Sequence, residues 1–410
     1  MRKILVSAYG CEPLKGSEQG VGWNWVLQMA KHNKVHVITR ANNQEPIEAH
    51  LCEDVKFNIT FHYYDTNDFI KGLKNKAKGL YFYYFCWQVG IIPLVLKLKK
   101  EISFDYSMHL TFGSMWMPTF LPLFNIPFIW GPVGGGDNEP ESFSTVLSYR
   151  EWFLHYVRKL MHRTSFLNPF IMLPAIKAQA ILVRTKNSAQ VIPGKYRDKV
   201  EVILETAMEN DVFNYSKDYS LCKDSSIRLV STGRLMPSKN IVSAVKALDQ
   251  LPFSRHVIYT IIGSGPERKR IEQEIDGLDL NDQVEIISEV PRKQVLEKLS
   301  ESDIYLFPSL REGGSWALME AMAVGLPVIC LKWSGMEIIT DQESAILLPV
   351  TDPEQMPRDM AKAICRLIDD PELRKRMGKA GRERIKNEFN WEAKGKFMER
   401  LLDELDGNVN

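Results

Sequence analysis

The sequence has few cysteines, and none of them stands in a pairing or metal-binding pattern. The six are spread along the chain as Cys11, Cys52, Cys86, Cys222, Cys330 and Cys365. No CxxC occurs, which disfavours both a structural zinc site and a disulfide framework. We therefore expect unpaired thiols in a reducing compartment.

The chain has almost no net charge, yet its charges are unevenly distributed. It contains 52 Lys and Arg against 51 Asp and Glu, which gives +1. Residues 1–200 hold 24 basic and 15 acidic residues, whereas residues 201–410 hold 28 and 36, so the halves carry +9 and −8. The length predicts roughly two or three domains, and the charge split indicates a basic half joined to an acidic half.

Long apolar runs are absent with one exception. Residues 80–96 (LYFYYFCWQVGIIPLVL) carry no charge over 17 positions, the short limit for a membrane span. A buried helix is the favoured interpretation, and a helix on a membrane surface and a span are the alternatives. The N-terminus (MRKILVSAYGCEP) meets Gly and Pro too soon for a signal peptide and predicts a first strand.

Short runs rich in Val, Ile and Phe alternate with amphipathic helical patterns, which is typical of parallel sheets covered on both faces. The expected strands are 3–7, 35–39, 57–63, 106–110, 128–130, 180–183, 200–204, 228–231, 257–262, 284–287, 304–307, 328–331 and 345–348.

The alternation runs twice, which predicts an α/β chain with two doubly wound, Rossmann-like domains and a ligand cleft at the carboxyl ends of their strands. The expected divisions are an N-terminal domain (1–208), a polar linker (209–226), a C-terminal domain (227–389) and a last helix (390–410) that could cross back to the first domain.

The strongest motif is FPSLREGGSWALMEAMAVGLPVIC at 307–330. Ser315 is a suitable N-cap for a helix, and backbone amides of Gly314 and Ser315 at its amino end could face an anion. Glu312 lies in the preceding loop. Glu320 is the only charge on so apolar a helix, so it needs a partner, either an arginine or backbone cap or a ligand hydroxyl.

A second motif, STGRLMPSK, follows an expected strand and places Arg234 and Lys239 in one turn region. An arginine fork and a lysine point charge together suit a diphosphate. Solvated loop cations would be the ordinary interpretation of this spacing alone, and the neighbouring acidic motif favours the phosphate role.

Two glycine-rich segments follow other strands. In IIGSGPER, Gly263 and Gly265 lack the third glycine of a dinucleotide fingerprint, and Pro266 is expected at the first helical position. A nucleotide over these glycines and a plain tight turn are equally compatible. In GCEPLKGSEQGVGWNW, Gly20 belongs to a flexible loop before a helix expected near Val21, where the backbone could approach a phosphate or sugar.

His109 stands near the end of the strand DYSMHL, and a lone histidine is more often structural than catalytic. IWGPVGGGDNEP follows, with three consecutive glycines, Gly134–136, at a strand end. Such a run is costly in conformational entropy, so a backbone geometry or a close ligand is expected to require it.

Together these motifs resemble the family 4 glycosyltransferases, retaining enzymes of the two-lobed GT-B fold, over nearly the whole chain. Glu312 and Glu320 fit the family's pair of glutamates eight residues apart, GRLMPSK its phosphate element and IIGSGPER its G-x-GP element. GSEQGVGW and the His109…GPVGGG pair are similar to a subgroup that builds bacterial surface polysaccharides.

The resemblance implies a role for each matching position. Arg234 and Lys239 would neutralise the donor diphosphate, Glu320 would bind the ribose hydroxyls, and His109 would contact the sugar or polarise the reacting centre. Glu312 would face the transferred sugar and its phosphate as a catalytic as well as a donor-binding residue. The remaining positions would bind the donor: Gly20, Gly263, Val290, Gly313, Gly314 and Ser315. SEVPRKQ lacks the Gly that commonly precedes the position of Val290 in the family. This departure weakens the assignment of Val290 to the binding site of the nucleotide base.

The expected reaction is retaining transfer of a sugar from a nucleoside-diphosphate sugar to a saccharide or lipid-linked acceptor, in capsule, O-antigen or exopolysaccharide synthesis. No DxD-like motif sits in a suitable loop, so we expect metal-independent catalysis and no cofactor. The alternatives are a GT-B sugar-nucleotide epimerase and a non-catalytic sugar-nucleotide binder. No nucleic acid partner is expected.

The acceptor side is less well defined. The stretch 149–163 (YREWFLHYVRKLMHR) mixes aromatic and basic residues, and with the lysines of 71–78 it could lie on an anionic membrane. A solvated helix face is the alternative. The expected location is the cytoplasm, with peripheral attachment to the inner face of the cytoplasmic membrane as a further hypothesis.

Overall fold

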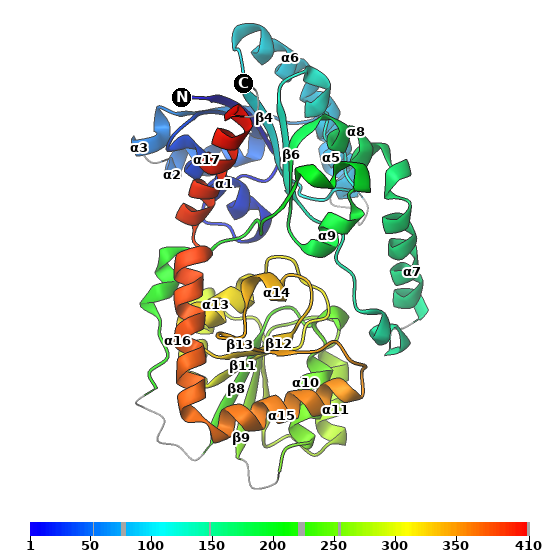
Figure 1. Ribbon diagram of the computed structural model, residues 1–410, viewed down its shortest axis with the longest axis vertical. Coiled ribbons are helices and arrows are strands. Elements are labelled where there is room, and N and C mark those ends of the chain that lie inside the picture. Colours follow the sequence, from blue (N-terminus) through cyan, green and yellow to red (C-terminus); the bar gives the residue numbers. More distant parts are fainter. Residues whose placement is uncertain (52, 75–78, 147–148, 220–225, 253–255, 408–410) are drawn as a thin grey trace. The chain divides into compact units, whose positions relative to one another are not determined.

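The computed structural model describes residues 1–51, 53–74, 79–146, 149–219, 226–252 and 256–407. The chain divides into two compact units. The first comprises Met1–Gly136, Leu160–Ala207 and Trp391–Asn410, and the second comprises Asp137–Lys159 and Met208–Asn390. Each unit is built around its own parallel sheet (Figure 1).

The first unit contains a seven-stranded sheet in the order β3-β2-β1-β4-β5-β6-β7. Its strands, all paired in parallel, are β1 Lys3–Ala8, β2 Lys34–Arg40, β3 Ile59–Tyr64, β4 Tyr106–Thr111, β5 Phe128–Val133, β6 Ala178–Val183 and β7 Val200–Val202. The strand order reverses between β1 and β4, and such switch points are where doubly wound sheets bind ligands.

Helices cover both faces of this sheet. They are α1 Ser17–Ala30, α2 Gln44–His50, α3 Glu53–Lys56, α4 Asp68–Leu73, α5 Gly79–Gly90, α6 Ile92–Glu101, α8 Pro169–Lys177, α9 Lys186–Val191 and α17 Trp391–Gly407. On one face, the C-terminal helix α17 lies beside α1 (Figure 1), and Met398 and Leu402 share a buried cluster with Trp25 and Met29. This contact joins the two ends of the described chain.

The second unit contains a six-stranded parallel sheet in the order β10-β9-β8-β11-β12-β13. The strands are β8 Ile227–Thr232, β9 Val257–Ile262, β10 Val284–Ile287, β11 Ile304–Phe307, β12 Val328–Leu331 and β13 Ala345–Leu348. The helices are α10 Ile241–Asp249, α11 Arg268–Gly277, α12 Arg292–Glu301, α13 Trp316–Val324, α14 Met336–Ile339, α15 Gln355–Asp369 and α16 Pro371–Glu388. Helix α7 (Tyr149–Arg163) begins among residues of this unit and ends among those of the first.

Every strand expected from the sequence is present, and five strands of the second unit have the predicted bounds. The apolar runs are buried on both faces, which is why their length and composition sufficed to locate them. Two helix starts were predicted wrongly. Helix α1 begins at Ser17 instead of near Val21, and α11 begins at Arg268 with Pro266 in the preceding turn.

The uncharged run 80–96 forms α5 and the first half of α6. Gly79–Glu101 is long and apolar enough to cross a membrane by length and composition, and a third (33%) of its most apolar window is buried. Tyr84 and Trp87 of α5 belong to the core of the first unit, whereas Tyr81 and Phe82 are exposed. The helix is thus half core element and half apolar surface.

Three cysteines of the described part of the chain are unpaired. Cys11, Cys86 and Cys330 carry free thiols. Cys52 and Cys222 lie outside the described residues.

Candidate active site

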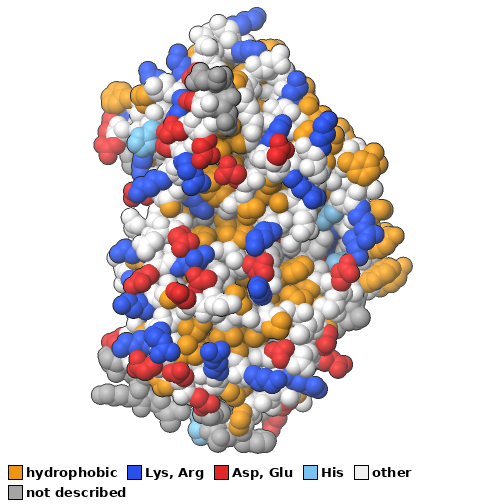
Figure 2. All heavy atoms as spheres, viewed as in Figure 1, with side chains coloured by type: hydrophobic (Ala, Val, Ile, Leu, Met, Phe, Trp, Pro, Cys, Tyr) orange, Lys and Arg blue, Asp and Glu red, His pale blue; other side chains and the backbone are white. Residues whose placement is uncertain are grey.

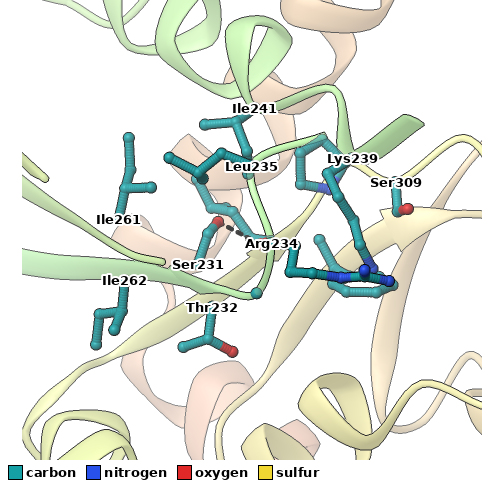
Figure 3. A pocket seen from close by; sticks show the side chains of 13 residues that line it. Ser231, Thr232, Arg234, Leu235, Lys239, Ile241, Ile261, Ile262 and Ser309 are labelled. Carbon is teal, nitrogen blue, oxygen red and sulfur yellow. Dashed lines mark hydrogen bonds between the residues drawn. The ribbon is translucent and has the colours of Figure 1, made fainter. Parts of the chain in front are cut away.

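A pocket opens at the carboxyl ends of β8, β9 and β11 in the second unit. It is lined by Ser231, Thr232, Gly233, Arg234, Leu235, Lys239, Ile241, Ile261, Ile262, Leu306, Phe307, Pro308 and Ser309. Figure 3 shows the Arg234 and Lys239 side chains extending to the same side of the loop after β8. The structure thus brings together the two cations that the sequence predicted to act as a pair.

Lys239 has a carboxylate partner within the same site. Its ammonium group forms an ion pair with Oε1 of Glu312, and the Ser309 hydroxyl donates to the same oxygen at 2.8 Å. The Lys239 nitrogen also lies 5.3 Å from the centre of the Phe307 ring. Arg234, in contrast, is exposed and makes no ion pair with any residue that the structure describes. Arg234 is therefore open to direct binding by an anion, whereas at Lys239 an anion would compete with Glu312.

Glu312 is held by the loop that follows β12. Its carbonyl oxygen accepts hydrogen bonds from the Ser334 hydroxyl at 2.6 Å and the Gly335 amide at 3.1 Å. A Cβ at Gly335 would lie 1.9 Å from the carbonyl oxygen of Gly313, so only glycine fits this approach. Two loops at neighbouring strand ends therefore fix the backbone of the acidic motif.

Helix α13 begins where the sequence predicts. The Ser315 hydroxyl caps it by accepting a hydrogen bond from the Leu318 amide at 3.4 Å, and Gly325 ends it with φ 101°. Gly313 and Gly314 are half-buried in the preceding loop. The amino end of α13, which carries a partial positive charge, thus follows Glu312 by only a few residues.

Glu320 has an arginine partner. Its Oε1 accepts a hydrogen bond from Nε of Arg292 at 2.6 Å, while Nη1 of Arg292 binds Asp211 at 2.6 Å. Glu320 is 8% exposed, and burial raises the pKa of its carboxyl although Arg292 opposes the rise. Of the two interpretations of this buried acid, the structure shows the arginine-capped one. Val290, the predicted base contact, is half-buried two residues before Arg292.

The glycines of the G-x-G element have a structural cause. A Cβ at Gly263 (φ 155°) would lie 1.9 Å from the carbonyl oxygen of Gly233, and one at Gly265 (φ 157°) would lie 2.3 Å from that of Leu235. The turn after β9 therefore packs backbone against backbone on the phosphate loop after β8. These glycines allow the two loops to pack together, and this holds with or without the base of a nucleotide over them.

His109 is deeply buried on β4 of the first unit. It is 1% exposed, its Nε2 lies 3.4 Å from the carbonyl oxygen of Phe112, and its Nδ1 has no partner among the described residues. Burial lowers the pKa of His109 to about 4. The imidazole is therefore neutral at pH 7, which suits a hydrogen-bonding role better than that of a charged electrophile.

Gly20 does not lie in a loop, contrary to the sequence prediction. It lies in the first turns of α1, where a Cβ would come within 2.0 Å of the carbonyl oxygen of Lys15. The glycine run has a similar packing cause, since a Cβ at Gly136 would lie 2.5 Å from Cα of Ser188. Close backbone contacts thus account for Gly20 and Gly136.

One buried carboxylate that lies beside the acidic motif was not identified from the sequence. Glu139, 7% exposed, binds Nη1 of Arg311 at 3.1 Å and Nη1 of Arg158 at 3.2 Å. The Ser334 hydroxyl oxygen also lies 2.6 Å from Oδ1 of Asp137. The segment after the glycine run therefore contacts both loops that hold Glu312. In the sequence, only Arg311, the neighbour of Glu312, could have indicated that a carboxylate lies here.

No group of three or more His, Cys, Asp or Glu side chains could hold a metal ion in the part of the chain that the structure describes. The side chains gathered at the pocket are instead suited to an anion.

Comparison with known proteins connects this geometry to a family. Residues 216–384 match the family described as Glycosyl transferases group 1. The amylovoran biosynthesis glycosyltransferase AmsK of Erwinia amylovora is 32% identical over 187 residues, which cover 44% of this chain and 45% of AmsK. The chain spans about half the length of the curated relatives it matches. These matches confirm the resemblance that the motifs indicated.

Solved structures are similar over the whole chain. Sucrose-phosphate synthase from Thermosynechococcus elongatus matches with a TM-score of 0.67 and 18% identity, covering 100% of both chains. HepE of Anabaena, solved in complex with UDP, matches with a TM-score of 0.64 and 14% identity, covering 98% of this chain and 100% of HepE. At such identities the likeness shows the fold, and the predicted two-domain GT-B class is confirmed.

Proposed function

We propose that this chain, which carries a glycosyl transferases group 1 domain at residues 216–384, transfers a sugar from a nucleoside-diphosphate sugar to a saccharide acceptor. The observation that carries the proposal is the convergence of Arg234, Lys239 and Glu312 at the carboxyl ends of β8 and β11. These residues lie within the matched segment, and two neighbouring cations suit a diphosphate.

The cations act on the leaving group. As the bond between the anomeric carbon and the phosphate oxygen breaks, negative charge grows on the nucleoside diphosphate. Arg234 binds the phosphate oxygens, and Lys239 exchanges its partner Glu312 for them, so both stabilise the developing charge. The amino end of α13 adds a partial positive charge to the same site.

Glu312 and Glu320 take separate roles. Glu312, released from Lys239, accepts hydrogen bonds from the transferred sugar. Glu320 accepts from the ribose hydroxyls, with Arg292 holding its carboxylate in place and ionised. Each carboxylate therefore has a cationic partner of its own. These partners offset the free-energy cost of keeping the two carboxylates ionised in a partly buried site.

Transfer proceeds with retention and without a metal ion. The anomeric carbon passes through an oxocarbenium-like state, and the acceptor hydroxyl attacks from the face that the phosphate leaves. The departing phosphate oxygen takes the proton of that hydroxyl, so no covalent enzyme intermediate forms. The protein's own cations replace the charge that a metal would supply.

We place the enzyme in the synthesis of a bacterial surface or secreted polysaccharide, at the cytoplasmic face of the membrane. AmsK, named for amylovoran biosynthesis, supports the polysaccharide assignment. UDP in the HepE structure supports a uridine donor, with a guanosine donor as the other case to test.

The exposed aromatic residues of α7 support contact with the membrane. Trp152 lies between Tyr149 and Tyr156, at ring distances of 6.3 and 6.1 Å, and all three are exposed. Figure 2 shows apolar and basic side chains gathered at the right of the view, where α7 lies in Figure 1. Arg158 and Lys159 already pair with Glu139 and Glu141, so we expect attachment to rest mainly on the aromatic rings.

Two experiments test these assignments. A screen of UDP-sugars and GDP-sugars, scored by donor binding and slow hydrolysis, is expected to select one nucleotide. Binding of neither nucleotide would refute the donor assignment. For the membrane, Trp152→Ser is expected to reduce co-sedimentation with anionic lipid vesicles at least about fivefold. Absence of wild-type co-sedimentation at low salt would exclude the attachment.

A further inference from the structure

A second cationic cluster lies in the first unit, at the carboxyl ends of β1, β2 and β3. Arg40 is the last residue of β2, Tyr9 follows β1 directly, and Asp65 follows β3 directly. Lys74 comes just after α4 and interacts electrostatically with both Arg40 and Asp65. Ligands of doubly wound sheets bind at this edge, and β1 borders the point where the strand order reverses.

Arg40 is buried without a full set of partners. It is 4% exposed, its Nε donates to the carbonyl oxygen of Tyr9 at 3.1 Å, and its guanidinium carbon lies 4.5 Å from the Tyr9 ring centre. Beyond a contact with the Tyr9 side chain, Nη1 and Nη2 form no ion pair with any residue in the described part of the chain. A single cation–π contact does not offset the loss of hydration of a buried charge.

Lys74 adds a second unpaired cation. It makes no ion pair with a described residue, and its nitrogen lies 5.4 Å from the Tyr83 ring centre. Burial and the neighbouring charge of Arg40 lower its pKa. Asp65 is the carboxylate that interacts with Lys74, but it already accepts hydrogen bonds from the Tyr83 hydroxyl at 2.5 Å and the Thr66 amide at 2.8 Å.

The hydroxyl group of Tyr9 is also unsatisfied. Tyr9 is 5% exposed, and its hydroxyl oxygen has no hydrogen-bond partner among the described residues. Burial raises the pKa of Tyr9 to about 12, so the hydroxyl keeps its proton and remains a donor. The cluster thus offers the Nη donors of an arginine, an ammonium group and a hydroxyl, with an excess of one positive charge.

We propose that Arg40, Lys74 and Tyr9 form a subsite for an anionic group of the acceptor, a carboxylate or a phosphate. The anion binding follows from the cluster itself, and its assignment to the acceptor rests on the proposed transferase function. Nη1 and Nη2 of Arg40 bind two oxygens of the anion side by side, Lys74 supplies the second charge, and Tyr9 donates to a remaining oxygen.

The consequence is selectivity for acidic acceptors. A uronic acid provides the carboxylate, whereas a phosphorylated sugar or a lipid phosphate provides the phosphate. A neutral sugar leaves Arg40 and Tyr9 without partners, and buried unpaired polar groups discriminate strongly against such ligands.

The test uses the full chain saturated with the nucleoside diphosphate that binds better, UDP or GDP, so that Arg234 and Lys239 are occupied. Calorimetric titrations then compare glucuronate, inorganic phosphate and glucose. We expect one anion to bind at a single site at least about tenfold more tightly than glucose. The tighter anion identifies the acceptor group as a carboxylate or a phosphate.

Variants assign the site. Arg40→Gln and Lys74→Gln are each expected to weaken anion binding at least about tenfold, and Tyr9→Phe about threefold, while Lys71→Gln on the exposed side of α4 has no effect. If Arg40→Gln fails to fold, Lys74→Gln and Tyr9→Phe decide. Anion affinity equal to wild type in Lys74→Gln and Tyr9→Phe, or no preference of the wild type for an anion over glucose, overturns the proposal.

The nucleotide titration separates the two claims. Intact nucleotide binding without Arg40-dependent anion binding overturns the subsite alone. Arg40-dependent anion binding in a chain that binds neither UDP nor GDP overturns the transferase function and leaves an anion-binding site.

Discussion

Glu320 on α13 accepts a hydrogen bond from Nε of Arg292 at 2.6 Å, so the acid expected to bind the ribose is capped by an arginine. A carboxylate so deeply buried needs this partner to stay ionised. Arg292 thereby fixes the orientation of the Glu320 carboxylate.

Removal of this carboxylate should weaken nucleotide binding. Glu320→Ala is expected to reduce the affinity for UDP or GDP about tenfold, because a charged acceptor for two ribose hydroxyls is lost. Glu320→Gln, which keeps one acceptor oxygen, is expected to lose less. Calorimetry with the free nucleoside diphosphates measures both. Unchanged affinity in Glu320→Ala would show that the residue only stabilises α13 through Arg292.

Lys239 should matter for turnover far more than for stability. Lys239→Ala is expected to lower kcat at least about a hundredfold, because the charge on the leaving diphosphate loses a fixed cation. The thermal midpoint should change little, since Glu312 keeps its hydrogen bond from Ser309. Lys246→Ala on α10, which removes an exposed ion pair with Glu274, is the matched control. If Lys239→Ala lowered the thermal midpoint as severely as kcat, a structural role for Lys239 would be favoured.

Gly263 should be indispensable for folding of the phosphate loop. A Cβ there would lie 1.9 Å from the carbonyl oxygen of Gly233, at a φ that side chains rarely adopt. Gly263→Ala is expected to destabilise the chain by about 3 kcal/mol, measured by denaturant unfolding. Gly277→Ala, where the added carbon meets nothing within 4 Å, serves as the control and should not destabilise. Equal stability of the two variants would disprove the packing explanation.

His109 should make the stability depend on pH. Its pKa is about 4 in the folded chain against an ordinary 6.5, so the unfolded chain binds more protons between these values. Its contribution to stability is therefore complete above pH 6.5 and falls as the pH drops toward 4, by about 3 kcal/mol at most.

The His109→Gln variant isolates the contribution of His109 to the pH dependence of stability. Unfolding free energies of wild type and variant are compared from pH 7 to pH 4, and their difference should shrink as the pH falls. A difference that stays constant over the whole range would mean that His109 is not buried in its neutral form.

The strands and the acidic motif were predictable because their signals are local. Each strand is a short apolar run, and Ser315, Glu320 and Gly325 mark one helix by its cap, its single charge and its end. The contacts of Arg292 with Glu320 and of Glu139 with Arg311 join distant parts of the chain, so no spacing in the sequence reveals them. The start of α1 was mistaken for a different reason. Gly20 was predicted to lie in a flexible loop, whereas it is required by the close approach of the Lys15 carbonyl oxygen to the first turns of the helix.

Net charge was a poor guide to the ligand. The acidic half of the sequence contains Arg234 and Lys239, the two cations of the pocket, and the basic half contains the unpaired Arg40. The position of a charge at a strand end, and whether it has a partner, decides what it binds.

The most direct test of the account is transfer from a nucleotide sugar by wild type and Lys239→Ala in the presence of EDTA. Release of the nucleoside diphosphate is followed for UDP-sugars and GDP-sugars. The account predicts that wild type turns over one donor class with EDTA present and that Lys239→Ala is at least about a hundredfold slower. Wild-type activity that vanishes in EDTA and returns with magnesium or manganese, or a Lys239→Ala variant as fast as wild type, would contradict it.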